Sequence, residues 1–86
     1  MRQMFRYELH ASAQRVFALS SDPVHVGATD DQVVEFWAED SDDAPTVERT
    51  FLVVGTGHPI PEGARYIGTC PRTPLGLVWH LYEVTP

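Results

Sequence analysis

The chain has no lysine, and Cys70 is its one cysteine. Because Cys70 has no second thiol to pair with, an internal disulfide is excluded, and nothing in the cysteine usage indicates an oxidising compartment. All six basic residues are arginine, a bias that the codon usage of a GC-rich genome would produce without any demand from the fold. We therefore expect a cytosolic protein.

Long apolar runs and a cationic N-terminal stretch are also missing. No apolar run reaches the roughly 18 residues that a membrane-spanning helix needs. The N-terminus lacks the basic stretch followed by an apolar core that marks a signal peptide. We expect a protein that is neither inserted into a membrane nor exported.

Positive charge is scarce, since six arginines stand against twelve Asp and Glu and the net charge is −6. Such a field repels phosphate backbones, so we expect no nucleic-acid partner. A partner protein with a basic surface is still compatible with the sequence, because an acidic segment such as residues 39–43 could attract it. Such a segment is more often simply a solvated turn.

The length of 86 residues allows one domain, residues 1–86, and excludes two. With 43% hydrophobic and 10% aromatic residues, the chain can still build one core.

Apolar residues recur at every second position along most of the chain, a period typical of half-buried strands. The pattern predicts strands over residues 5–9, 15–19, 24–28, 33–39, 46–54, 65–70 and 77–84. Polar or Gly/Pro-rich segments separate them and predict a hairpin turn at 29–32, a surface loop at 40–45 and a turn at 71–76. We expect a mainly β fold, a small antiparallel sandwich or barrel of six to seven short strands, with room for one short helical turn near 61–64.

Two of these strands have informative faces. Between residues 33 and 39 one face is fully apolar, while the other carries Trp37 between two glutamates. Trp37 is therefore a candidate interface residue on an outer or second packed face. Residues 77–84 carry bulky side chains on both faces, which predicts a strand in the middle of a sheet or between packed layers.

The segment from Gly55 to Gly63 contains three glycines and two prolines, and it is the most distinctive loop. Glycines let a backbone approach a ligand and form a concave set of N–H groups, so Gly55, Thr56, Gly57 and His58 form a candidate binding loop, with Arg65 as a nearby donor. The alternative is structural, with the glycines supplying unusual backbone angles and His58 holding a turn.

Catalytic and metal-binding patterns find little support. The four histidines lie far apart in the sequence, and one cysteine cannot form a thiolate cluster, so we expect no metal and no cofactor. Residues 40–43 resemble half of a calcium loop but lack its glycine and bidentate glutamate. Cys70 would need an adjacent base such as His58 or His80 to act as a nucleophile, and a lone cysteine is more often a small buried apolar residue.

The run Gly55-Thr56-Gly57-His58-Pro59-Ile60-Pro61, followed by Tyr66-Ile67-Gly68-Thr69, resembles a signature of small uncharacterised phage and prophage proteins. The likeness extends to the segments 6–9, 36–38 and 78–83 and so covers most of the chain. It implies a phage origin, the cytoplasm of the infected bacterium as location, and a compact β fold. It supplies no activity and no catalytic residue.

These observations favour a non-enzymatic phage accessory protein that binds a host or phage protein and can self-associate into a homodimer. Two alternatives stay open. The chain is compatible with a protein that binds or sequesters a small phosphorylated signal through residues 55–63 and nearby arginines, and with a minor virion component.

Overall fold

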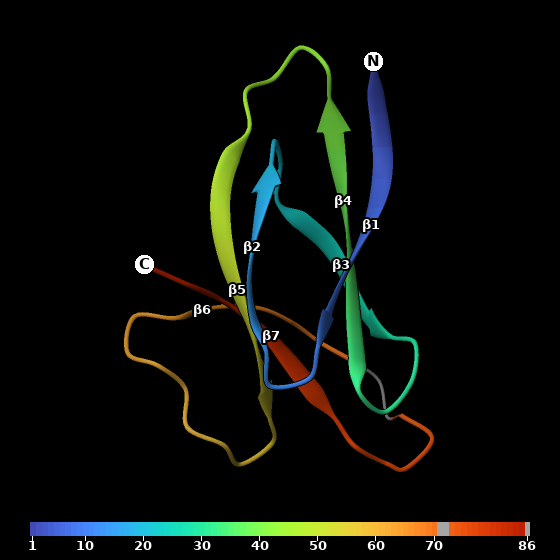
Figure 1. Ribbon diagram of the computed structural model, residues 1–86, viewed down its shortest axis with the longest axis vertical. Helices are drawn as coiled ribbons and strands as arrows, with labels where there is room; N and C mark the ends of the chain where they lie inside the picture. The colour runs from blue at the N-terminus through green and yellow to red at the C-terminus, as the bar shows by residue number, and fades with distance from the viewer. Residues whose placement is uncertain (71–72, 86) are drawn as a thin grey trace.

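The computed structural model describes residues 1–70 and 73–85, which form two packed antiparallel sheets (Figure 1). The seven strands are β1 (Arg2–His10), β2 (Gln14–Leu19), β3 (Pro23–Ala28), β4 (Val33–Ser41), β5 (Val47–Gly55), β6 (Arg65–Thr69) and β7 (Trp79–Val84). One sheet has the order β1-β4-β3 and the other the order β2-β5-β7-β6. The predicted mainly β fold is confirmed, and it is a small sandwich.

The core lies between the sheets and follows from the alternation along each strand. On β4 the predicted apolar face is confirmed, because Val34, Phe36 and Ala38 are all fully buried. They pack against the inward side of the other sheet, where Phe51 and Leu81 are equally buried. Rings of Phe36 and Phe51 lie 5.0 Å apart, so aromatic contact joins the two central strands.

Strand β7 occupies the middle of its sheet, as its two bulky faces predicted. It pairs with β5 on one side and β6 on the other. Its inner face carries Trp79, Leu81 and Glu83, while His80 and Tyr82 lie on the outer face.

The hairpin of β3 and β4 also forms as predicted. The amide of Thr29 donates to the Val33 carbonyl at 3.1 Å, which closes the turn. Within it, the Asp30 carboxylate accepts the Gln32 amide at 2.7 Å, the local bond that makes Asp common in turns.

Three predicted strand boundaries were wrong by two or three residues, and several others by one residue. Strand β1 begins at Arg2 instead of residue 5, and β4 continues through Ser41, so the loop expected at 40–45 starts only at Asp42. The two extensions pair with each other, since Arg2 lies opposite Ser41. Strand β7 begins at Trp79 instead of residue 77 because Leu77 bonds locally with Thr73 through both its amide and its carbonyl.

The β5–β6 connection contains no helical turn at 61–64. The Ala64 amide donates to the Pro61 carbonyl at 3.1 Å, and Gly63 has a φ of +80°. That φ lies in the left-handed region, so the segment is a β-turn and cannot be a right-handed helix. The expected turn at 71–76 lies partly outside the described residues, and its described part folds back at Gly76, whose amide donates to the Thr73 carbonyl at 2.8 Å.

The sandwich has two long sides that differ in construction. We call the side formed by β3 and β6 the closed side, because these strands lie along each other. There the buried Cys70 thiol donates to the Gly27 carbonyl at 3.1 Å. We call the side formed by β1 and β2 the open side. Its cross-sheet contacts include the Tyr7 and Phe17 rings, 5.4 Å apart, and Arg15, which donates to the Glu8 carbonyl at 2.9 Å.

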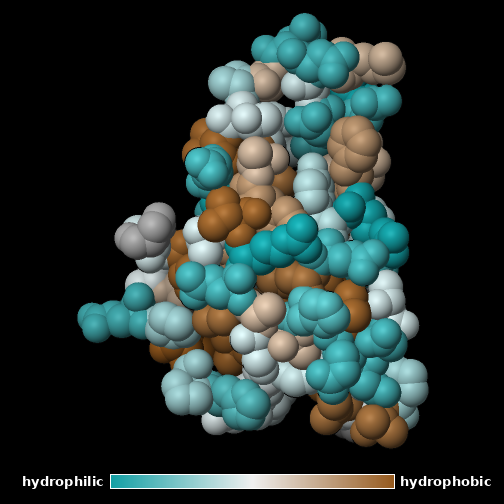
Figure 2. All heavy atoms as spheres, in the orientation of Figure 1, coloured by the Kyte–Doolittle hydropathy of each residue, from teal (hydrophilic) through white to brown (hydrophobic). Residues whose placement is uncertain are grey.

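The surface in Figure 2 alternates hydrophilic and apolar areas, and apolar residues are visible over β1, β2 and β5. Exposed apolar side chains on these strands include Met4, Phe5, Val16 and Val47. Residues 1–70 and 73–85 contain no helix long and apolar enough to cross a bilayer.

Candidate binding surfaces

The loop predicted to bind a ligand begins with a tight turn. The His58 amide donates to the Gly55 carbonyl at 3.0 Å, and Gly57 has a φ of +85°. A positive φ at the third position is typical of a type II turn and explains the glycine. One of the amides expected to face an anion is therefore used inside the turn.

The His58 ring folds back over Gly55. A Cβ added to Gly55 would lie 2.9 Å from the His58 ring and 3.1 Å from the Trp79 ring, so a larger residue here would displace the His58 ring from this position. Beside these rings is a hollow of about 320 Å³, lined by residues 55, 56, 58 and 76–79. The loop thus closes against the sheet and lines a hollow at the same time.

Arg65 does not share this hollow. Gly55 lies opposite Trp79 at one end of β7, whereas Arg65 lies opposite Glu83, four residues further along that strand. At about 3.3 Å per residue the separation along the strand is roughly 13 Å. The structure brings together Gly55, Thr56 and His58 but places Arg65 elsewhere.

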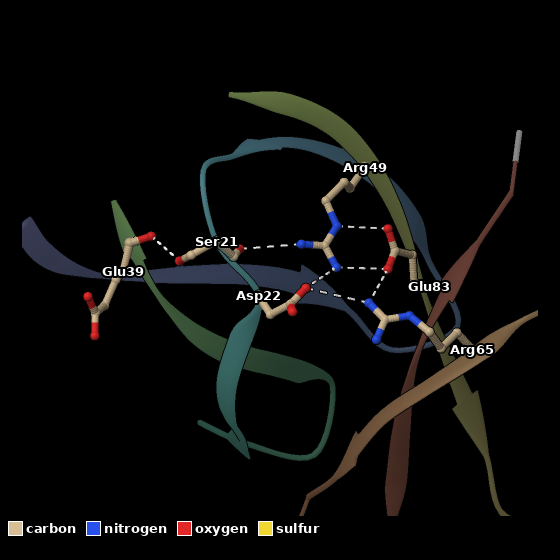
Figure 3. Close-up of polar contacts among 6 residues, drawn as sticks. All are labelled: Ser21, Asp22, Glu39, Arg49, Arg65 and Glu83. Atoms are coloured by element: carbon tan, nitrogen blue, oxygen red, sulfur yellow. Dashed lines mark hydrogen bonds and ion pairs between the residues drawn. The ribbon is translucent and has the colours of Figure 1, made fainter. Parts of the chain in front are cut away.

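Arg65 belongs instead to a cluster of two arginines and two carboxylates that connects β5, β6, β7 and the segment before β3 (Figure 3). Arg49 donates to both oxygens of Glu83, each at 2.8 Å. Arg65 donates to Glu83 at 2.6 Å, and Asp22 lies 2.9 Å from Arg49. The Arg49 guanidinium, reinforced by Arg65, lowers the pKa of Glu83 to about 2.

This cluster joins segments that are distant in the sequence. Arg49 also donates to the Ser21 carbonyl at 3.3 Å, which holds the connection between β2 and β3 against β5. Both guanidinium groups are paired with carboxylates, so the cluster carries no excess positive charge for a phosphate. The geometry is that of a structural clamp.

A second polar group, which sequence reasoning missed, lies on the outer face of the four-stranded sheet. The two ring nitrogens of His80 are 2.9 Å from the Thr56 hydroxyl and 3.0 Å from the Thr69 hydroxyl. The Tyr66 hydroxyl continues the chain, 2.6 Å from Thr69. The four residues are spread over 25 positions of the sequence, and no motif spacing marks them.

Cys70 is a structural residue. Its side chain is buried, and its thiol donates to the Gly27 carbonyl. Burial, with a smaller contribution from the Glu35 charge, raises the pKa of Cys70 to about 11, so the thiolate is disfavoured. Both nitrogens of His80 are bonded to hydroxyls, and the hydrogen bond that the thiol makes is to a backbone carbonyl.

Trp37 lies on the outer face of the three-stranded sheet, one of the two placements that the alternation predicted. It is half-buried, and the His25 ring lies 5.4 Å away at an angle of 44°. Gly27 lies next to the indole, and a Cβ there would make an ordinary contact of 3.5 Å with the Trp37 ring. Ion pairs flank the indole, one between Arg6 and Glu35 and one between Arg2 and Glu39.

In the part of the chain that the structure describes, no three His, Cys, Asp or Glu side chains lie close enough together to hold a metal ion.

A family model described as a domain of unknown function, DUF7352, matches residues 1–86. The chain belongs to this family. Comparison of the chain with curated proteins and with solved structures found no match.

The most regular feature of this DUF7352 domain is the free edge of β1. The amide of Ala11 donates to Gln32 and the carbonyl of Met1 accepts from Asp42, so odd-numbered residues at both ends of the strand face β4. Because backbone groups alternate between the two sides of a strand, even-numbered residues face away. Arg15 bonds the carbonyl of one of them, Glu8, which agrees with this assignment.

Proposed function

We propose that this protein is a non-enzymatic accessory protein that binds another protein by adding a strand to the free edge of β1. The observation that carries the proposal is the length and regularity of that edge. All nine residues of β1 pair with β4 without a register shift. Among the described residues its free edge is bonded at two carbonyls near one end, Glu8 by the Arg15 side chain and His10 by the Ala13 amide. An unpaired row of N–H and C=O groups is a ready template for a partner strand.

The other three edge strands are less suited to pairing. Strand β3 has a register shift between Pro23 and His25, and β6 has one between Tyr66 and Gly68. Such irregularities twist an edge and interrupt its ladder. Strand β2 is regular but has only six residues. The comparison favours β1.

Exposed side chains along β1 add contact area. Met4 is 52% and Phe5 42% exposed, and they lie on opposite faces of the strand. A strand docked beside them would gain apolar contact on both faces as well as backbone hydrogen bonds.

The absence of enzymatic activity is part of the proposal. It is supported by the polar groups described above, which are engaged with one another: the Cys70 thiol with a backbone carbonyl, His80 with two hydroxyls, and Arg49 with Glu83. A phage origin and action in the cytoplasm of the infected bacterium are supported by the sequence resemblance described above and by the single cysteine.

A capture experiment from a lysate of the infected bacterium tests this function. Met4→Pro removes one free-edge N–H and leaves the bonds to β4 intact, so it should abolish capture of the bound protein. The matched control is Val16→Pro on β2, because residue 16 also faces away from its neighbour strand and is equally exposed, 51% against 52%. Equal capture by both variants, or no specific capture by the unmodified chain, would refute strand addition at β1.

A second candidate, small-molecule binding, is favoured by the hollow beside His58 and Trp79. A ligand that binds only the folded chain raises the melting temperature. Thermal shift across a nucleotide library should then show a rise that His58→Ala removes. A flat response across the library eliminates nucleotides as ligands of this hollow.

A further inference from the structure

We infer that the strand added to β1 is the β1 strand of a second copy, running antiparallel about a twofold axis at Phe5. This inference rests on the proposed use of the β1 edge and names its partner. In this register Arg2 lies opposite Glu8 of the other copy and Met4 lies opposite Arg6. The two three-stranded sheets then join into one continuous six-stranded sheet with the order β3-β4-β1-β1-β4-β3.

The backbone satisfies this register. In an antiparallel ladder, the strands bond through opposite residues whose N–H and C=O groups both point at the partner strand. In this register each of these hydrogen-bonded pairs joins two even-numbered residues. Residues 2, 4, 6 and 8 are among the even-numbered residues of β1, whose backbone groups point away from β4. No own-chain strand bond has to break for the second copy to dock.

Charge selects this register over its neighbours. Moving the axis to Met4 places Arg2 opposite Arg6, and moving it to Arg6 places that arginine opposite itself. Like charges directly opposite each other on a sheet are destabilising. An axis at Tyr7 would pair Arg6 with Glu8 but place the Glu8 carbonyl, already bonded by Arg15, near the centre of the ladder. The axis at Phe5 also uses this carbonyl, but only in the last pair of the ladder, where it would accept from Arg2 as well as from Arg15.

The axis at Phe5 instead places opposite charges, Arg2 and Glu8, across from each other at both ends of the paired segment. Glu8 lies directly opposite Glu35 within its own sheet, and both carboxylates share the single guanidinium of Arg6, each at 3.0 Å. Arg2 of the second copy would bring another cation to this carboxylate pair. Its side chain is 75% exposed and bonds Glu39 of its own chain, so this guanidinium would turn from Glu39 towards the carboxylate pair or be shared between them.

The inner face contributes an aromatic pair. Phe5 is 42% exposed although it lies on the core side of its sheet. At the twofold axis it meets Phe5 of the second copy in a non-hydrogen-bonded pair, where opposite Cα atoms come to about 4.5 Å. Aromatic cross-strand pairs of this kind are among the stabilising ones.

The first test uses charge exchange and analytical ultracentrifugation of the full chain. We expect a dimer for the unmodified protein at about 0.15 M salt, where a Debye length of about 8 Å screens the like net charges. Arg2→Glu and Glu8→Arg each place like charges opposite each other twice, so each variant alone should raise the dimer dissociation constant by about tenfold.

Mixing the two variants supplies the decisive control. In a heterodimer of Arg2→Glu with Glu8→Arg, both ends again carry opposite charges, so dimerisation should return to about the unmodified level. A fold defect in either variant could not be repaired in this way. Failure of the mixture to dimerise more tightly than either variant alone would overturn the register.

A crosslink locates the axis independently. Phe5→Cys places two thiols at a Cα separation within the range that a disulfide spans, so mild oxidation should give a covalent dimer. The matched control, Val16→Cys, presents a similarly exposed thiol on β2 and should stay monomeric, and Cys70 is buried. Equal crosslinking of the two variants would overturn the axis at Phe5.

Failure of this inference can be told apart from failure of the proposed function. If the unmodified chain is monomeric up to millimolar concentration while Met4→Pro still abolishes capture of another protein, the second copy is rejected and strand addition stands. If Met4→Pro leaves both dimerisation and capture unchanged, both ideas are rejected.

Discussion

The closed and open sides of the sandwich differ in how far their edge strands are protected from pairing with another chain. Both sides end in edge strands whose backbone groups lack a neighbour strand. On the closed side, β3 and β6 lie along each other, carry register shifts and are joined by the Cys70–Gly27 hydrogen bond. On the open side, β1 is long and regular, and Arg15 is its one described side-chain cap.

This difference shows that each edge strand is protected by its own register and its own neighbours, and not by the sandwich as a whole. Register shifts and cross-sheet packing at β3 and β6 leave little room for a partner strand, whereas β1 keeps free backbone groups next to exposed apolar side chains. We therefore expect mutations on the closed side to act mainly on stability and mutations on the β1 edge to act mainly on association.

The largest effect is expected from Gly68→Ala on the closed side. The added Cβ would lie 2.7 Å from a methyl carbon of Val26, which is itself 94% buried, since its exposed fraction is 6%. Overpacking of this kind costs about 1–3 kcal/mol, which urea unfolding would measure. The double variant with Val26→Ala removes the 2.7 Å contact and keeps only the one to Val26 Cβ at 3.2 Å, so it should lose less stability than the sum of the two single variants. A loss equal to that sum would contradict this account.

An intermediate effect is expected at Glu83, which helps to hold the closed side. Its pKa is lowered from 4.5 to about 2 in the folded chain, chiefly by Arg49. A lowered pKa stabilises the fold above the unfolded value, so this contribution is fully present above about pH 4.5 and is lost as the pH falls towards 2. After allowance for solvent screening it amounts to about 1–2 kcal/mol.

Glu83→Gln should therefore lower stability at neutral pH by that amount and flatten the acid limb of the stability curve. Thermal unfolding followed between pH 7 and pH 2 checks both effects. The control is Glu48→Gln, whose carboxylate is exposed on the outer face of β5. An acid limb that is as steep in Glu83→Gln as in the unmodified chain would contradict the assignment.

The smallest effect is expected from Arg15→Ala on the open side. This change removes the hydrogen bond to the Glu8 carbonyl and the contact of the guanidinium with the Phe17 ring, 5.0 Å from its centroid. Arg15 itself is exposed, so the free energy of unfolding should fall by only about 0.5–1 kcal/mol. Arg15→Lys is the control, because it retains the charge over the ring. A loss as large as that of Gly68→Ala would erase the contrast between the two sides.

Sequence alternation predicted the strands well because a half-buried strand must place apolar side chains at every second position. It identified the fully buried face of β4 and the central place of β7. It failed at strand ends, where pairing between Arg2 and Ser41 extends two polar segments that have no apolar signal of their own. The helical turn failed for a related reason, since the sequence does not show which glycine adopts a positive φ.

The candidate sites were less predictable than the strands. The sequence singled out residues 55–58, and the structure gathers three of them around one hollow. It did not show that Arg65 lies at the far end of β7, nor that Arg49, Asp22 and Glu83 meet, because these partners are brought together by strand pairing and sheet packing.

The sequence by itself determined a lysine-free, acidic chain without a disulfide, with strands where apolar residues alternate and turns where Gly, Pro and Asp gather. These properties depend on side-chain chemistry and short-range sterics, which act within a few residues. Only the tertiary structure decided which strands became edges, which edge stayed regular, and which charges met, because those outcomes depend on contacts between residues far apart in the chain.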